Sequence, residues 1–144
     1  MISHNNLEEL PKSINRLVNL KQLCCDDNKL KLLPNTFCYL KNLKILNLRN
    51  NKLSYLPDNF GNLNKLEELY LTNNEFQILP NSIIKLINIF HFDVDKNIRK
   101  KIIFFQLNFL NIAYSVFDNN DKIIVKNKRI NNTKFKVKII NIFI

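Results

Sequence analysis

The sequence predicts an α/β-type solenoid, with a short parallel sheet on its concave face and an irregular or short-helical convex side. The first observation is that the prolines recur every 23 residues. The second is that the apolar residues around them keep the same spacing, which is typical of stacked structural repeats. The four prolines and their preceding leucines are Leu10-Pro11, Leu33-Pro34, Leu56-Pro57 and Leu79-Pro80.

Strands are expected about ten residues after each proline, near 20–28, 43–51, 66–74 and 89–97. In the triplet Leu46-Asn47-Leu48, apolar and polar residues alternate as the two faces of a strand require. The inward column holds Leu23, Leu46, Leu69 and Phe92. One repeat alone cannot offset the entropy of ordering its 23 residues, so the units must share one core with their neighbours.

An asparagine column follows the strands at the same 23-residue spacing. Its members are Asn5, Asn28, Asn51, Asn74 and Asn97. Asparagine tolerates unusual backbone angles, and its amide can bond backbone groups that leave regular structure. We therefore expect a ladder of side-chain amides that satisfies the buried turns.

The complete unit is L-x-x-L-x-L-x-x-N-x-L-x-x-L-P-x-x-[IF]-x-x-L-x-x over residues 5–97. This pattern resembles the leucine-rich repeat, in the 23-residue intracellular form of Ras-pathway scaffold proteins and of the plant intracellular Ras-group-related leucine-rich-repeat proteins. The resemblance implies a non-catalytic module that binds a partner protein on its concave sheet, in intracellular signalling or scaffolding, and that needs no cofactor.

The outward strand positions define the expected partner-binding surface. The candidate residues are Gln22, Asp26, Asn47, Arg49, Glu68, Tyr70, Thr72, His91, Asp93 and Asp95. Tyr70 and Arg49 are of the types that anchor protein interfaces, and both should lie near the middle of the sheet. Four strands at about 4.8 Å spacing offer about 15 Å of width, which suits a peptide or loop. The alternative is a solvated polar face without a dedicated ligand.

Catalytic and metal sites are not predicted. Gly61 is the single glycine, so a glycine-rich phosphate loop is excluded. Cys24 and His91 should lie in the first and fourth strands, too far apart for a nucleophile and its base. His91, Asp93 and Asp95 alternate along one strand, which separates them by nearly 7 Å each. We therefore expect no enzyme activity, no metal and no small-molecule substrate.

Cysteine usage indicates a reducing compartment. The chain has an odd number of cysteines, and Cys24 and Cys25 should point to opposite faces of one strand. The N-terminal residues have neither the basic nor the apolar region of a secretory signal. The expected location is the cytoplasm.

The repeats predict two parts, a solenoid over 1–97 with a partial first unit and a basic segment over 98–144. That first unit starts midway, which leaves open that the chain is a fragment of a longer protein. The first part has 12 Lys and Arg against 10 Asp and Glu, and the second has 10 against 2, a net charge of +8.

Two interpretations of residues 98–144 stay open. One is a degenerate repeat at 107–115 with a β-hairpin cap made from 121–126 and 135–139, turning at 131–132. The other is a poorly structured tail. A basic tail also suggests an alternative function, binding to an anionic membrane or nucleic acid.

Overall fold

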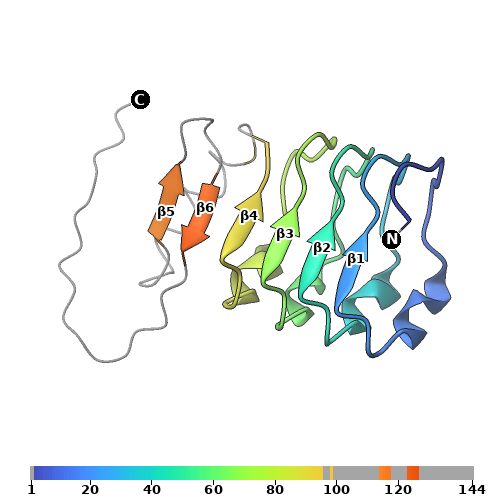
Figure 1. The fold of residues 1–144 in the computed structure, drawn as a ribbon, viewed down its shortest axis with the longest axis horizontal. Helices are drawn as coiled ribbons and strands as arrows, with labels where there is room; N and C mark the ends of the chain where they lie inside the picture. Colours follow the sequence, from blue (N-terminus) through green and yellow to red (C-terminus); the bar gives the residue numbers. More distant parts are fainter. Residues whose placement is uncertain (1, 96–97, 99–113, 118–122, 127–144) are drawn as a thin grey trace.

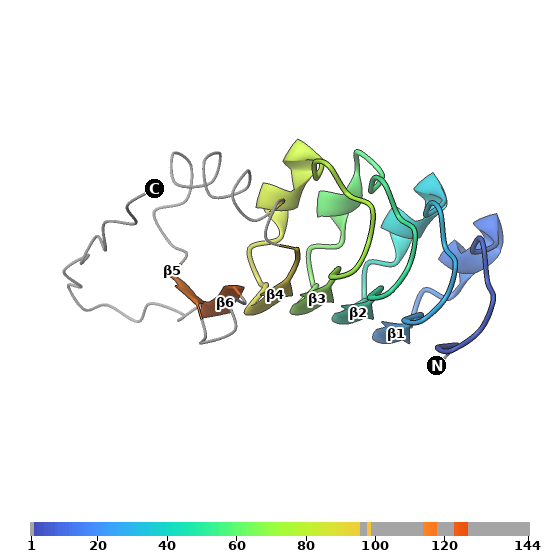
Figure 2. The same ribbon diagram turned by 90° about the horizontal axis from the view of Figure 1, so that it is seen from above.

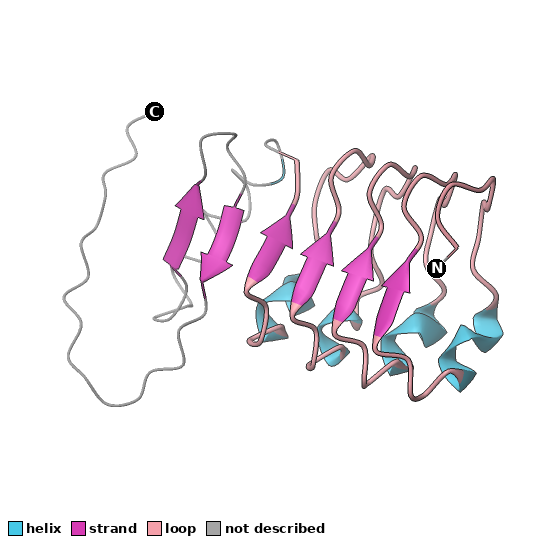
Figure 3. Cartoon of the chain, viewed as in Figure 1, coloured by secondary structure: helices cyan, strands magenta, loops and turns pink. Residues whose placement is uncertain are grey.

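A computed structural model of the chain describes residues 2–95, 98, 114–117 and 123–126. Four short strands form one parallel sheet, in the order β1 (Gln22–Cys24), β2 (Ile45–Asn47), β3 (Glu68–Tyr70) and β4 (His91–Asp93). Short 3₁₀ helices lie on the opposite side, as Figures 1 and 2 show. They are η1 (Lys12–Arg16), η2 (Asn35–Tyr39), η3 (Phe60–Asn62) and η4 (Asn81–Lys85). The predicted solenoid is confirmed, and Figure 3 distinguishes its strands from its helices.

The register of the sheet follows the 23-residue period. Gln22 pairs with Ile45, Ile45 with Glu68, and Glu68 with His91. Each strand has three residues, at the centre of the longer range that the sequence predicts. Residues at the same place in successive repeats therefore become neighbours across the sheet, about 4.8 Å apart.

The inward columns form one continuous core. Leu46 and Leu69 on the strands are fully buried, as are Phe37 and Phe60 on the helical side. Three of the prolines directly precede 3₁₀ helices and have φ near −65°. In each repeat the proline carbonyl accepts the N–H of the residue three positions later, as from Phe37 to Pro34 at 2.8 Å. Burial at about 25 cal/mol per Å² of apolar surface is the main source of stability.

The asparagine ladder is confirmed at Asn28, Asn51 and Asn74. The side-chain oxygen of Asn51 accepts the N–H of Leu30 in the preceding repeat at 2.9 Å. Its amide nitrogen donates to the carbonyls of Cys25, Leu48 and Arg49 at 3.0 to 3.1 Å. Asn28, Asn51 and Asn74 thus satisfy backbone groups of two repeats at once, whereas Asn5 donates to the carbonyls of Ile2 and Ser3 in its own unit. Asn97 lies outside the described residues.

The unusual backbone angle lies one residue earlier than the sequence predicts. The residues with positive φ are His4, Asp27, Asn50 and Asn73, at 53° to 57°. These residues again recur every 23 positions. The reversal of the chain there turns the next residue, the ladder asparagine, toward the interior. The left-handed position accepts Asn, Asp and His because their short polar side chains tolerate it.

Gly61 marks a close approach between η3 and η4. A Cβ atom at this position would lie 2.1 Å from the backbone oxygen of Ser82. The Gly61 N–H also donates to the hydroxyl of Ser82 at 3.1 Å. Glycine is therefore required by packing, not by a left-handed backbone.

After the solenoid, β5 (Tyr114–Phe117) and β6 (Ile123–Lys126) form an antiparallel pair, with β6 beside β4 in Figure 1. Ile123–Lys126 falls inside the predicted strand 121–126, but its pairing partner is Tyr114–Phe117. Residues 135–139, which we expected as the partner, lie outside the described residues. So does most of the expected degenerate repeat at 107–115. The division at residue 97 stays a prediction.

Candidate functional site: the concave sheet face

Three side-chain columns line the concave face, one for each outward position of the strands. We call them the concave face throughout. The first column holds Gln22, Ile45, Glu68 and His91; the second Cys24, Asn47, Tyr70 and Asp93; the third Asp26, Arg49, Thr72 and Asp95. The strand pairing fixes the first two, and hydrogen bonds such as Asp27 N–H to Arg49 O at 3.1 Å extend the alignment to the third. The predicted site residues therefore share one surface.

An ion pair spans the middle of this face. The guanidinium of Arg49 donates through Nε to Oδ2 of Asp93 at 3.0 Å, and Nη2 donates to the same oxygen. Arg49 comes from just after β2 and Asp93 from β4, so the arginine crosses over β3. The Arg49 side chain is 31% exposed and that of Asp93 is 2% exposed.

Tyr70 of β3 lies between these two residues. The guanidinium carbon of Arg49 is 4.1 Å from the centroid of the Tyr70 ring, within the range of a cation–π contact. The ring also contacts the imidazole of His91, with the ring centroids 4.7 Å apart. Arg49, Tyr70, Asp93 and His91 form what we call the central cluster. Its contacts restrict the rotamers of Arg49 and Tyr70.

The Tyr70 hydroxyl has a defined partner. It donates to Oε2 of Glu68 at 2.5 Å. Burial, followed by this hydrogen bond and the negative charge of Glu68, raises the pKa of Tyr70 to about 12. Tyr70 is therefore a neutral hydrogen-bond donor at neutral pH, and its position gives no sign of an activated phenolate.

Asp93 differs from the other outward residues because its side chain is buried. Arg49 lies against it, and the Thr72 hydroxyl is 3.4 Å from Oδ2. Oδ1 is buried and has no hydrogen-bond partner among the described residues. Asp93 acts as an anchor that positions Arg49, while the arginine and the tyrosine form the accessible surface.

Three other carboxylates on the face are partly exposed and have no ion pair with a described residue. Asp26 accepts the Ser3 hydroxyl at 2.7 Å, and Glu68 accepts Tyr70. Asp95 accepts the backbone N–H of Asn73 at 3.1 Å. Their hydrogen bonds come from neutral donors, so their negative charges are not compensated locally within the described part of the chain.

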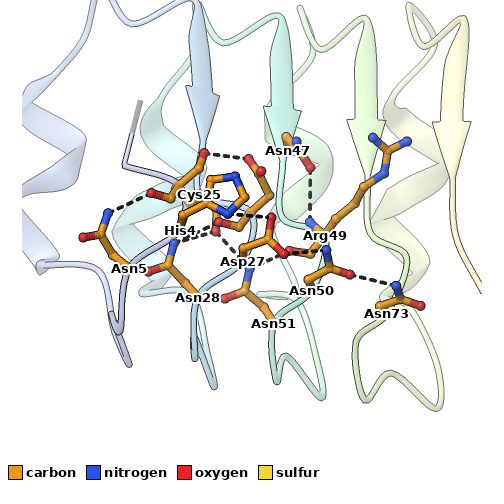
Figure 4. A network of polar contacts seen from close by, with 12 residues as sticks. His4, Asn5, Cys25, Asp27, Asn28, Asn47, Arg49, Asn50, Asn51 and Asn73 are labelled. Carbon is orange, nitrogen blue, oxygen red and sulfur yellow. Dashed lines mark hydrogen bonds and ion pairs between the residues drawn. The ribbon is translucent and has the colours of Figure 1, made fainter.

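A second ladder runs along the rim of the solenoid, through the positive-φ column (Figure 4). Asn73 donates to Asn50 and Asn50 to Asp27, both at 2.7 Å, and His4 Nδ1 lies 3.3 Å from Asp27 Oδ2. His4, Asp26 and Asp27 also place possible metal-ligand atoms within 4.8 Å of one another. His4 and Asp27 belong to the rim ladder and Asp26 accepts the Ser3 hydroxyl, so each of the three already contacts a protein side chain.

All three cysteines are free thiols. Burial raises the pKa of the Cys25 thiol to about 12 and that of Cys38 to about 11, so both are inert core residues. Cys24 and His91 lie on β1 and β4, the two edges of the four-stranded sheet. The topology therefore separates them, and they cannot act as nucleophile and base. Within the described part of the chain, no helix has the length and apolar character needed to cross a bilayer.

The 23-residue pattern indicates which residues point outward, including Arg49 and Tyr70, but it does not indicate the contacts between them. Arg49 and Asp93 are 44 residues apart, almost two full repeats. No local pattern indicates such a pair. The 23-residue column of His4, Asp27, Asn50 and Asn73 was a signal that could have revealed the rim ladder.

Comparisons with known proteins agree with this architecture. The leucine rich repeat family model matches residues 25–76. A solved structure of a leucine-rich-repeat protein from Leptospira interrogans is similar, with 37% sequence identity and a TM-score of 0.59. The match covers 64% of this chain and 23% of that one, so this chain spans less than a quarter of that protein's length. No curated protein matches the sequence.

Proposed function

We propose that this leucine-rich-repeat protein is a non-catalytic module that binds a partner protein on its concave face, as a scaffold in cytoplasmic signalling. The observation that supports this most strongly is the central cluster. An aromatic ring and a guanidinium, the side chains most enriched at interface hot spots, are held in place at the middle of the sheet. The family match supports a role in protein–protein interaction.

The small area of the sheet limits the partner. Four strands give a face about 15 Å wide, which fits a peptide segment or a single loop. A stable interface between two globular proteins needs about 800 Å² from each partner. The described face therefore suits a linear segment, or one part of a larger interface.

The decisive experiment compares partner capture by matched variants. Replacing Arg49 alone would leave Asp93 buried without its cation, which is strongly destabilising. The test variant is therefore Arg49→Leu with Asp93→Leu and Tyr70→Ala, because apolar residues of similar volume can replace a buried ion pair at little cost. The control variant is Arg16→Leu with Tyr55→Ala, two exposed positions away from the concave face.

Immobilised wild type and both variants are incubated with extract of the source cell, and bound proteins are identified by mass spectrometry. The concave variant should lose the specific partner while the control keeps it, with equal circular dichroism for all three. Capture that persists in the concave variant would exclude this face as the binding site.

The alternative function, binding to anionic membranes or nucleic acid, depends on residues 98–144, most of which lie outside the described residues. It stays a hypothesis supported by the +8 net charge of that segment. Retention on heparin that falls with salt and disappears after truncation at Asn97 would support it.

A further inference from the structure

We propose that the concave face recognises a partner segment in extended conformation with Lys or Arg side chains at positions i and i+4. This inference rests on the proposed function, since it names the chemistry of the ligand at the same face. The concave face is acidic although the protein is basic. The three columns hold four carboxylates and one guanidinium, a formal net charge of −3 in a protein whose formal net charge is +10.

The arrangement of these charges defines the ligand. The one cation, Arg49, is already paired with Asp93. Asp26, Glu68 and Asp95 remain partly exposed, and their described hydrogen bonds come from neutral groups. A partner that supplies ammonium or guanidinium groups could form ion pairs with these three carboxylates, whereas an acidic partner would be repelled.

The hydrogen-bonding groups of the cluster lead to the same conclusion. Asp26, Glu68 and Asp95 each present two carboxylate oxygens, which accept hydrogen bonds and donate none. The hydroxyls of Tyr70 and Thr72 are both directed at carboxylates of the face. Acceptors therefore outnumber donors on this surface, so a ligand rich in N–H groups is the complementary one.

The geometry of the sheet sets the spacing of the cations. Asp26 follows β1 and Asp95 follows β4 in the same column, so three strand spacings separate them, about 14 Å. An extended chain advances about 3.3 Å per residue, so side chains at i and i+4 are about 13 Å apart and point to the same side. A segment lying across the strands can therefore reach both carboxylates and pass over Arg49 and Thr72 between them.

The direct test is fluorescence anisotropy with the full chain. The probe is a labelled nine-residue peptide of Ser and Thr with Lys at positions 3 and 7, and the matched peptide has Gln at both positions. The test variant is Asp26→Asn with Glu68→Gln and Asp95→Asn. The control variant is Glu9→Gln with Asp58→Asn and Glu75→Gln, three exposed carboxylates away from the concave face with the same change in net charge.

The lysine peptide should bind wild type at least tenfold more tightly than the Gln peptide, and more weakly as salt is added. The variant that lacks the three carboxylates (Asp26, Glu68 and Asp95) should bind the lysine peptide about tenfold more weakly than wild type. The control variant should change the affinity less than twofold. Equal binding of both peptides, or equal loss in both variants, would overturn the inference. Self-association of wild type that is abolished in the variant lacking the three carboxylates would also overturn the inference, because the ligand would then be a basic segment of a second copy.

The result separates this inference from the proposed function. Partner capture that depends on the central cluster but is indifferent to the three carboxylates would refute the basic ligand and leave the proposed function intact. Capture that persists both without the central cluster and without the three carboxylates would refute the proposed function itself.

Discussion

The inner and outer faces of the same strands follow opposite rules. On the inner face a column such as Leu23, Leu46, Leu69 and Phe92 stays apolar in every repeat, and all four members are buried. On the concave face, the aligned column reads Cys24, Asn47, Tyr70 and Asp93, and no two residues are alike. Repetition builds the core because each unit packs on an equivalent neighbour. Variation gives each position of the concave face a different side chain.

This contrast predicts that a large side chain contributes far more to the free energy of unfolding in an inner column than at an exposed position. Phe60→Ala removes a fully buried ring from the helical side of the core and should cost about 3–5 kcal/mol of unfolding free energy. Tyr55→Ala removes a ring that is 53% exposed and should cost less than about 0.5 kcal/mol. Urea denaturation followed by circular dichroism measures both, and equal midpoints would contradict the assignment of core and surface.

The central cluster should break the simple rule that the outer face contributes little to stability. Arg49→Ala leaves the buried Asp93 carboxylate without its cation and should cost about 3 kcal/mol. The control is Lys44→Ala, because Lys44 pairs with Glu67 at 2.7 Å between two exposed side chains. Its loss should cost below about 1 kcal/mol.

A double substitution tests whether removing the buried charge restores the stability. The double substitution Arg49→Leu with Asp93→Leu should recover most of the stability that Arg49→Ala loses. A double variant as unstable as Arg49→Ala would show that the cost arises from packing and not from the uncompensated charge.

The two asparagine ladders should also differ. Asn51→Ala deprives the buried Leu30 N–H of its acceptor and should destabilise the fold by about 2 kcal/mol. Asn50→Gly removes an exposed rung of the rim ladder but keeps the left-handed backbone, and should cost less than about 0.5 kcal/mol. Hydrogen exchange at the Leu30 amide provides an independent measurement, since it should accelerate in Asn51→Ala alone.

The smallest expected effect is the titration of one phenol. Tyr70 should ionise near pH 12, so the difference between the alkaline absorbance titrations of wild type and Tyr70→Phe should have its midpoint there. Because the folded pKa lies above the unfolded value, the stabilisation is complete below about pH 10 and is lost as pH rises through 12. A midpoint near 10 would contradict the partial burial of Tyr70 and its hydrogen bond to Glu68.

Much of the fold could be predicted because the sequence pattern recurs every 23 residues, so each repeat supports the same assignment independently. Leu46-Asn47-Leu48 identifies one strand, and its equivalents confirm the register of the others. The partner of β6 could not be predicted in this way, because the repeat pattern ends near residue 97 and no column remains to fix the pairing. Local alternation indicates that 123–126 is a strand but does not choose its neighbour.

The sequence by itself determined the repeat, the division of the strand residues into inner and outer faces, and the identity of the buried asparagines. These follow from spacing along the chain, which is a local property. Only the tertiary structure decided that Asp93 is buried, that Arg49 crosses β3 to reach it, and that Tyr70 lies between them. Contacts between side chains of non-adjacent repeats depend on how the units stack and on which rotamers the neighbours allow. The spacing of residues along the chain determines neither.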